Sequence, residues 1–189
     1  MAPVKVLIVP GSNRLASLNV KLAGYIAREL TLMGAHATRI SLADYPMPIY
    51  DGDDEAQNGI PGPARKLIAQ FKAHDAVVIV SPEYNGSIPG LLKNAIDWMS
   101  RDGVAPFRDR VFAIAAASPG ALGGMRVLLA LRQCLGFALG ALIIPEQFSL
   151  PAANKAFDDN GALNDEQRAK FLTAMLTGLI ERATLLRKP

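Results

Sequence analysis

The chain has 189 residues, half of them hydrophobic, with a formal net charge of +3 and a mean hydropathy of +0.20. This length and composition suit a single domain over residues 1–189 and exclude a chain that is disordered throughout. Basic and acidic residues are interspersed, which gives no basis for nucleic-acid binding and indicates a modest preference for anionic ligands.

The single cysteine, Cys134, excludes an internal disulfide and a thiolate metal cluster. It lies in an apolar run, so we expect a buried structural thiol. The apolar stretch over residues 4–9 is too short for a signal peptide, and no stretch of the sequence reaches membrane-spanning length. We therefore expect a cytoplasmic protein without a membrane partner.

Strands and helices are predicted to alternate along the chain. Apolar runs rich in β-branched residues predict strands, and apolar residues at helical spacing predict helices. In chain order these are strand 4–9, helix 17–33, strand 35–41, helix 63–73, strand 76–80, a helix opening near Pro89, strand 110–117, helix 122–139, strand 141–144 and a last helix. Gly34 is expected to end the first helix, and Asn164 with Gln167 to start the last as a capping box. Residues 44–63, rich in Pro, Gly and Asp, are expected to form an irregular connection.

This strict alternation predicts a parallel sheet with helices on both faces. Right-handed crossovers leave few topologies. Five strands favour the flavodoxin-like order over the six-stranded dinucleotide-binding fold. We therefore expect an α/β fold, a flavodoxin-like three-layer sandwich around a five-stranded parallel sheet of order 2-1-3-4-5.

In such sheets, ligands bind outside the carboxyl ends of the strands, where the strand order reverses. Three loops meet that description. We call residues 11–19 the first loop, residues 81–90 the second loop and residues 117–124 the third loop.

The first loop carries hydroxyls, amides and one arginine, and no acidic residue follows before Glu29. Since a helix N-terminus favours Asp or Glu in its first turn, their absence suits an external anion such as phosphate. Ser12, Ser17 and Asn19 are candidate hydrogen-bond donors, and Arg14 adds charge. Plain helix capping by Ser17 with a solvated Arg14 is the alternative. The P-loop and G-x-G-x-x-G patterns are missing, which disfavours triphosphate chemistry and a Rossmann-type cofactor.

The second loop is polar and rich in proline and glycine. Pro82 stiffens its backbone, and Gly86 and Gly90 permit close approach. Its backbone amides would suit a flat heteroaromatic ring, with Asn85 at the edge and Tyr84 near a face. The alternative is a turn whose tyrosine packs on the neighbouring helix.

Two features of these loops are weaker. Glu83 is a candidate general base, but a glutamate here more often anchors its own loop or makes a subunit contact. The third loop has glycines at 120, 123 and 124. They give the clearance that a flat ligand needs, and tight turns need the same clearance.

Other classes of site find no support. His36 and His74 are isolated, and no cluster of His, Cys and carboxylates resembles a metal site. Gly-x-Ser-x-Gly is absent, which excludes a nucleophile elbow. The acidic residues within 51–55 are expected to be solvated charge.

Four segments form an ordered set of motifs over most of the chain up to about residue 150. They are Gly11-Ser12-x-Arg14-x-x-Ser17-x-Asn19, Pro48-Ile49-Tyr50, Ser81-Pro82-Glu83-Tyr84-Asn85-Gly86-Ser87-x-Pro89-Gly90-x-Leu92-Lys93-Asn94-Ala95-Ile96-Asp97-Trp98, and Ser118-x-Gly120-x-x-Gly123-Gly124. Together they resemble the NADPH-dependent FMN reductase family, which includes quinone, azo-dye and chromate reductases. The long third motif is the most specific. Pro10 and Pro119 depart from the residues usual in the family.

The resemblance implies a bound FMN and assigns residues to it. Its phosphate would be held by Ser12, Arg14, Ser17 and Asn19; Pro82, Glu83, Tyr84, Asn85 and Ser87 would line the ribityl and isoalloxazine parts; and Ser118 and Gly120 would flank the ring. No side chain is assigned as a catalytic acid or base, and no metal is implied. A homodimer or homotetramer with the flavin near a subunit boundary is also implied. The helix expected over residues 125–139, apolar on most sides, fits that assembly.

The implied activity is that of an FMN-dependent NAD(P)H oxidoreductase. A hydride would pass from NAD(P)H to bound FMN and then to a quinone, flavin, azo or metal-oxyanion acceptor. One alternative is a flavodoxin-type electron carrier, although such carriers are typically acidic and this chain is not. An enzyme that uses FMN as a loosely held substrate is another, and a flavin-free regulatory protein on the same fold is a third.

Overall fold

The computed structural model describes residues 2–187. Its centre is a five-stranded parallel sheet of order β2-β1-β3-β4-β5. The strands are β1 (Lys5–Pro10), β2 (His36–Arg39), β3 (Ala76–Val80), β4 (Val111–Ala117) and β5 (Leu142–Leu150). The flavodoxin-like fold class and strand order predicted from the sequence are therefore confirmed.

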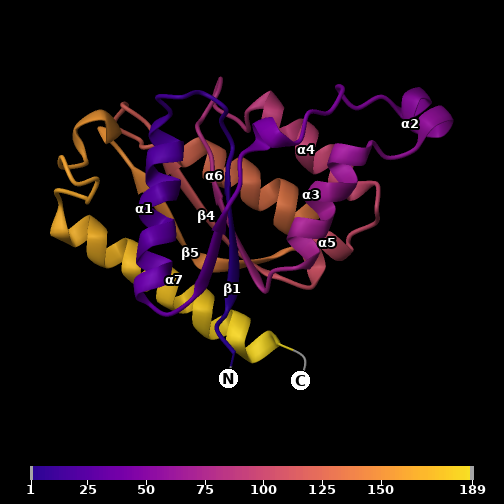
Figure 1. Cartoon of the computed structure of the whole chain (residues 1–189). Coiled ribbons are helices and arrows are strands. Elements are labelled where there is room, and N and C mark those ends of the chain that lie inside the picture. Colours follow the sequence, from indigo (N-terminus) through magenta and orange to yellow (C-terminus); the bar gives the residue numbers. More distant parts are fainter. Residues whose placement is uncertain (1, 188–189) are drawn as a thin grey trace.

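Helices cover both faces of the sheet (Figure 1). They are α1 (Leu18–Leu32), α2 (Gly52–Asn58), α3 (Gly62–Lys72), α4 (Gly90–Ser100), α5 (Ala105–Arg108), α6 (Met125–Leu131) and α7 (Glu166–Leu186). One core lies between the sheet and α1 with α7, and the other between the sheet and α3 to α6. Within residues 2–187, no helix is long and apolar enough to cross a membrane.

The continuous apolar runs of the strands follow from this burial on both faces. Val6 and Ile8 of β1 face the α1–α7 core, whereas Leu7 and Val9 face the opposite core. β3 and β4 alternate in the same way and are fully buried. Because each such side chain contributes roughly 1.5–3 kcal/mol on burial, the sheet and its helices form a rigid base for the loops at its ends.

β5 is longer than predicted. The sequence prediction ended the strand at residue 144, but β5 continues through Pro145 because it lies at the edge of the sheet, where proline is tolerated. The register against β4 shifts at this point, and the Arg132 side chain donates hydrogen bonds to the carbonyls of Ile144 and Pro145. The strand then continues to Leu150.

The helix expected over residues 122–139 is also different. α6 starts only at Met125, because Gly123 and Gly124 have φ values of +60° and +87°. From residue 132 the chain continues as a π-helix, η2 (Arg132–Ala138). Cys134 in η2 is half-buried rather than buried, and desolvation raises the pKa of its thiol.

Three smaller expectations are resolved by the structure. Gly34 follows α1 in a left-handed conformation, with φ +82°, as predicted for the residue that ends this helix. The capping box at Asn164 is wrong by one residue, since the Asp165 carboxylate accepts hydrogen bonds from the backbone of Gln167 and Arg168. Residues 44–63 are not wholly irregular, because they contain α2, which projects away from the sheet in Figure 1.

Candidate functional site

A cleft of about 420 Å³ opens at the carboxyl ends of the central strands. All three loops line it, as the strand-end rule predicts. Its walls are Ser12, Arg14, Ala16, Ser17, Leu18, Asn19, Pro82, Glu83, Tyr84, Ala117, Ser118, Pro119 and Asn154. The structure thus brings together most of the site residues predicted from the sequence; Asn85, Ser87 and Gly120 lie outside this lining set.

The start of α1 forms one end of the cleft. Ser17 caps the helix by accepting a hydrogen bond from the Val20 N–H, and the first turn of α1 has no acidic residue. The hydroxyl oxygen of Ser12 accepts from the Arg14 N–H. Both hydroxyls accept from the backbone and keep their own hydrogen to donate to an anion. With the positive end of the helix dipole and the exposed Arg14, this end suits phosphate.

Asn19 is buried, with 2% of its surface exposed. Its side-chain amide donates to the Ala117 carbonyl at 2.9 Å and accepts from the Ala117 N–H at 2.8 Å. This pair of bonds ties the first turn of α1 to the carboxyl end of β4. Asn19 therefore holds the two walls of the cleft together, and one amide hydrogen is left for a ligand.

The second loop contains a tight turn at its tip. The backbones of Tyr84 and Ser87 exchange two hydrogen bonds, and the residues between them, Asn85 and Gly86, have φ values of 51° and 75°. Positive φ at both central positions is typical of a type I′ turn, for which Asn-Gly is the preferred sequence. Tyr84 is 45% exposed and lines the cleft, so its ring is open to a ligand rather than packed away.

Glu83 anchors the second loop to α6. One carboxylate oxygen accepts from the Arg126 N–H and the other from the Arg126 guanidinium, both at 3.0 Å. These contacts agree with the expectation that this glutamate anchors its own loop. The carboxylate also lies at the positive end of α6, where negative charge is favoured.

The glycines of the third loop serve close packing. A Cβ on Gly123 would lie 2.6 Å from the Pro151 nitrogen, and one on Gly124 would lie 2.7 Å from the Ala116 Cβ. A tight, closely packed turn, rather than clearance for a flat ligand, therefore accounts for the glycines at positions 123 and 124. Ser118 accepts a hydrogen bond from the Gly120 N–H and lines the cleft.

Asn154 is the cleft residue that sequence reasoning missed. It comes from η3 (Ala153–Lys155), just after β5. The strand-end rule, applied where the strand order reverses, selected the loops after the first, third and fourth strands only, so the segment after the edge strand β5 was not considered.

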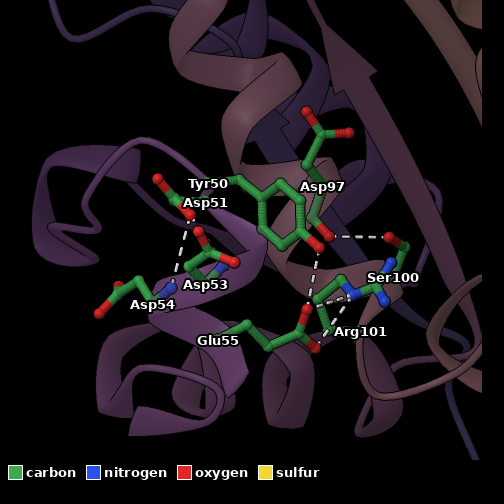
Figure 2. Close-up of polar contacts among 8 residues, drawn as sticks. All are labelled: Tyr50, Asp51, Asp53, Asp54, Glu55, Asp97, Ser100 and Arg101. Carbon is green, nitrogen blue, oxygen red and sulfur yellow. Dashed lines mark hydrogen bonds and ion pairs between the residues drawn. The ribbon is translucent and has the colours of Figure 1, made fainter. Parts of the chain in front are cut away.

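The acidic residues after β2 form a structural cluster (Figure 2). Asp51 caps α2, and Glu55 accepts hydrogen bonds from the Tyr50 hydroxyl at 2.9 Å and from Arg101 at 3.0 Å. The expectation of solvated charge was therefore wrong for Glu55, which is paired with Arg101, whereas Asp51 is exposed. No group of metal-ligating side chains is found within residues 2–187.

Fold and cleft together define a flavodoxin-like protein with a cleft at its strand ends. The model of the NADPH-dependent FMN reductase family matches residues 4–155. A quinone reductase of Escherichia coli (strain K12) is 36% identical over 184 residues, covering 94% of each chain. An NAD(P)H-dependent FMN reductase of Pseudomonas aeruginosa is 34% identical over 177 residues, covering 93% of each. The chain belongs to the NADPH-dependent FMN reductase family.

The solved structures agree with this assignment. The flavoenzyme NAD(P)H:(acceptor) oxidoreductase FerB of Paracoccus denitrificans superposes with a TM-score of 0.79 at 28% identity, covering 96% of this chain and 98% of FerB. By family, the chain is an FMN-dependent NAD(P)H oxidoreductase. The cleft fits that cofactor: its volume is in the range of cofactor sites, one end suits phosphate, and an exposed tyrosine lines it.

Proposed function

We propose that the cleft between the three loops is the FMN site and that the chain, as one domain, reduces quinone-type acceptors with NAD(P)H. The observation that carries the proposal is that the first turn of α1, which has no acidic residue, lines one cleft together with Tyr84 of the second loop and Ser118 of the third. When bound, FMN supplies the redox chemistry, taking up hydride from NAD(P)H and passing electrons to the acceptor. The residues of this chain bind the cofactor and orient it.

The start of α1 forms the phosphate end of the site. Ser12 and Ser17 donate through their hydroxyls, Arg14 supplies a positive charge, and Asn19 fixes the helix against β4. The remaining amide hydrogen of Asn19 completes the set. No carboxylate lies in the first turn of α1 to repel the anion.

The second and third loops form the end of the site that holds the flavin ring. The turn at Asn85 and Gly86 fixes the direction of the loop, and Pro82 and Tyr84 present its inner surface to the cleft. Ser87 and Gly120 stand at the margin of this region and shape the loops rather than line the cleft. Because these loops are held by backbone hydrogen bonds, their orientation is set before a ligand arrives.

The acceptor class rests on the relatives. The Escherichia coli and Pseudomonas putida relatives are quinone reductases, each 36% identical to this chain. Tyr84 is 45% exposed and lines the cleft, and an aromatic side chain there suits an aromatic acceptor or a nicotinamide ring. Flavins accept two electrons as quinones do; azo compounds and metal oxyanions are further acceptors, whose full reduction takes more than one turnover of the cofactor.

We also propose that the protein acts as a cytoplasmic homo-oligomer. Phe137 is 90% exposed and Leu129 is 59% exposed. Phe137 borders a groove of about 520 Å³ between α4 and η2, also lined by Ile88 and Ala130. Large exposed apolar side chains beside an apolar groove are typical of association sites. Light scattering checks this directly: Phe137→Asp is expected to lower the mass to that of a single chain, and a monomeric wild type would contradict it.

The function is tested on the purified holoprotein under anaerobic conditions. Addition of NADPH or NADH should bleach the visible bands of bound flavin, and 1,4-benzoquinone should restore them. Steady-state rates with both substrates should follow a ping-pong pattern. Bands that persist after NADPH and NADH would contradict the reductase and favour an electron carrier, and protein that takes up no FMN would contradict the site.

A further inference from the structure

The segment that follows β5 closes the cleft from a fourth side. The Ala153 N–H donates to the Ser118 carbonyl at 3.1 Å, and the Ser118 N–H donates to the Leu150 carbonyl at 3.1 Å. The Asn164 side chain holds the far end of η3 by donating to the Lys155 carbonyl. Asn154 is thus carried on a turn that is fastened at both ends and lines the cleft.

The backbone of this turn is unusual. Ala152 has φ 46° and ψ 36°, the left-handed conformation that residues with a Cβ rarely adopt. Ala153 beside it is 1% exposed and packs in the α1–α7 core. Buried packing at Ala153 and the bonds to the third loop hold Ala152 in this conformation. Such backbone outliers are typical of positions that present a side chain to a ligand.

Most polar side chains of the cleft are bonded within the described chain, whereas Asn154, like Arg14 and Tyr84, makes no side-chain hydrogen bond there. Ser12, Ser17 and Ser118 each accept from a backbone N–H, and Asn19 and Glu83 are held as described above. Within residues 2–187, the Asn154 amide has no hydrogen-bond partner, and the side chain is exposed. Its two donors and its acceptor are all open to a ligand.

The position of Asn154 selects the phosphate end of that ligand. Asn19, in the first turn of α1, is bonded to Ala117, and the next residue, Ser118, is bonded to Ala153. Ala153 packs in the α1–α7 core, so Asn154 lies on the α1 side of the third loop, and it lines the same cleft as Ser17 and Ser118. An amide N–H on this side of the cleft is available to an anion that α1 already favours.

We propose that Asn154 is a further FMN-binding residue, whose amide donates a hydrogen bond to the phosphate end of the cofactor. This inference rests on the proposed site in the cleft and extends it to a strand end that no motif covers. It predicts a residue that discriminates FMN from riboflavin, since riboflavin has the same ring and ribityl chain without the phosphate.

The test is titration of apoprotein with FMN and with riboflavin, followed by flavin fluorescence. Asn154→Ala is expected to raise the Kd for FMN about tenfold, the usual effect of a lost hydrogen bond to a charged group. Asn154→Asp should weaken FMN further, because a carboxylate repels the phosphate. The Kd for riboflavin should stay within about twofold of wild type in both variants, by the same reasoning.

Asn160→Asp is the matched control. It makes the same charge change in the same exposed segment, outside the cleft, and should bind FMN like wild type. Unchanged FMN affinity in both Asn154 variants would overturn the inference while leaving the site intact. An equal loss of affinity for riboflavin would also overturn the inference, because it would show that Asn154 contacts the part that both flavins share and not the phosphate. A wild type without FMN affinity would overturn the site itself.

Discussion

At the scale of single residues, most of the side chains around the cleft hold the loops in place. The side chains of Asn19 and Glu83 bond to distant segments of the chain, and that of Ser118 bonds within its own loop, so only a few groups are left free for a ligand. The site is therefore organised before binding, which lowers the ordering cost of holding a cofactor. Substitutions here should be separated into those that move a loop and those that remove a ligand contact.

Glu83 and Arg126 offer such a separation. The carboxylate side chain is 14% exposed and the arginine 62% exposed, so solvent weakens the ion pair. In a double-mutant cycle of Glu83→Gln and Arg126→Met, we expect a coupling of about 0.5–1 kcal/mol in the free energy of unfolding. Chemical denaturation of the four proteins measures it. Coupling near zero would show that the backbone contact to α6, rather than the ion pair, anchors the loop.

Gly124 is expected to tolerate no side chain. Gly124→Ala combines a φ of +87° with a Cβ placed 2.7 Å from the Ala116 Cβ, and should destabilise the fold by roughly 3 kcal/mol. Gly34→Ala is the control, because Gly34 has a similar φ of +82° with nothing within 4 Å, and should cost about 1 kcal/mol. Thermal or chemical unfolding gives both values. Equal losses in the two variants would mean that the contact with Ala116 relaxes freely.

At the scale of elements, α2 stands apart because it has no buried residue. A helix of seven residues is not stable by itself in water, so it depends on its attachments. The main attachment is the Glu55 carboxylate, which accepts from Tyr50 and Arg101 (Figure 2). The Tyr50 ring packs edge-on against Trp98 of α4, with centroids 5.1 Å apart. The segment is thus joined to α4 through a few side chains.

This attachment should depend on pH. Hydrogen bonds from Arg101 and then from Tyr50 lower the pKa of Glu55 below its ordinary value of 4.5. A lowered folded-state pKa stabilises the folded form above the ordinary value, and the stabilisation is lost as pH falls through the lowered pKa. Hydrogen exchange of the α2 amides should therefore become less protected below about pH 4.5. In Glu55→Gln this extra loss should be missing; the same loss in the variant would assign the effect to another group.

At the scale of the whole molecule, the sequence predicted the sheet and its order because each inner strand is a continuous apolar run. The same reasoning failed at the edge strand, where Pro145 interrupts the apolar run. There the Arg132 side chain donates to the Ile144 carbonyl, and pairing with β4 resumes beyond it, which no local pattern predicts. Asn154 was missed because no motif covers it and because it follows the edge strand rather than one of the three strands that the strand-end rule selected. The site residues of the three loops were predicted because motifs carry them, whereas the bonds of Asn19 and Glu83 join distant segments and no local pattern encodes them.

Arg187, near the end of the described chain, closes the fold at the pole opposite the cleft. Its guanidinium donates to the carbonyls of Ala2 and Pro3 and to the Asp75 carboxylate, which also accepts from the Lys5 N–H at 2.7 Å. Burial alone would raise the pKa of Asp75, but the hydrogen bonds from Arg187 and Lys5 outweigh it and the pKa is lowered from its ordinary value of 3.8. One carboxylate thus joins both ends of the chain to the start of β3.

Asp75→Asn should therefore lower the free energy of unfolding of the whole molecule at neutral pH by about 1–3 kcal/mol. The loss is this large because the pair is mostly shielded from solvent: the side chains of Asp75 and Arg187 are 26% and 22% exposed. Since the folded-state pKa is lowered, wild type holds this stability above pH 3.8 and loses it as pH falls through the lowered pKa, so the two proteins should converge in acid. Asp102→Asn removes the same charge from an exposed pair with Lys72 and should cost no more than about 1 kcal/mol. Denaturant unfolding at neutral pH and well below pH 3.8 decides the matter: a difference between wild type and Asp75→Asn that persists undiminished in acid would show that lost packing, and not the charge of Asp75, is responsible.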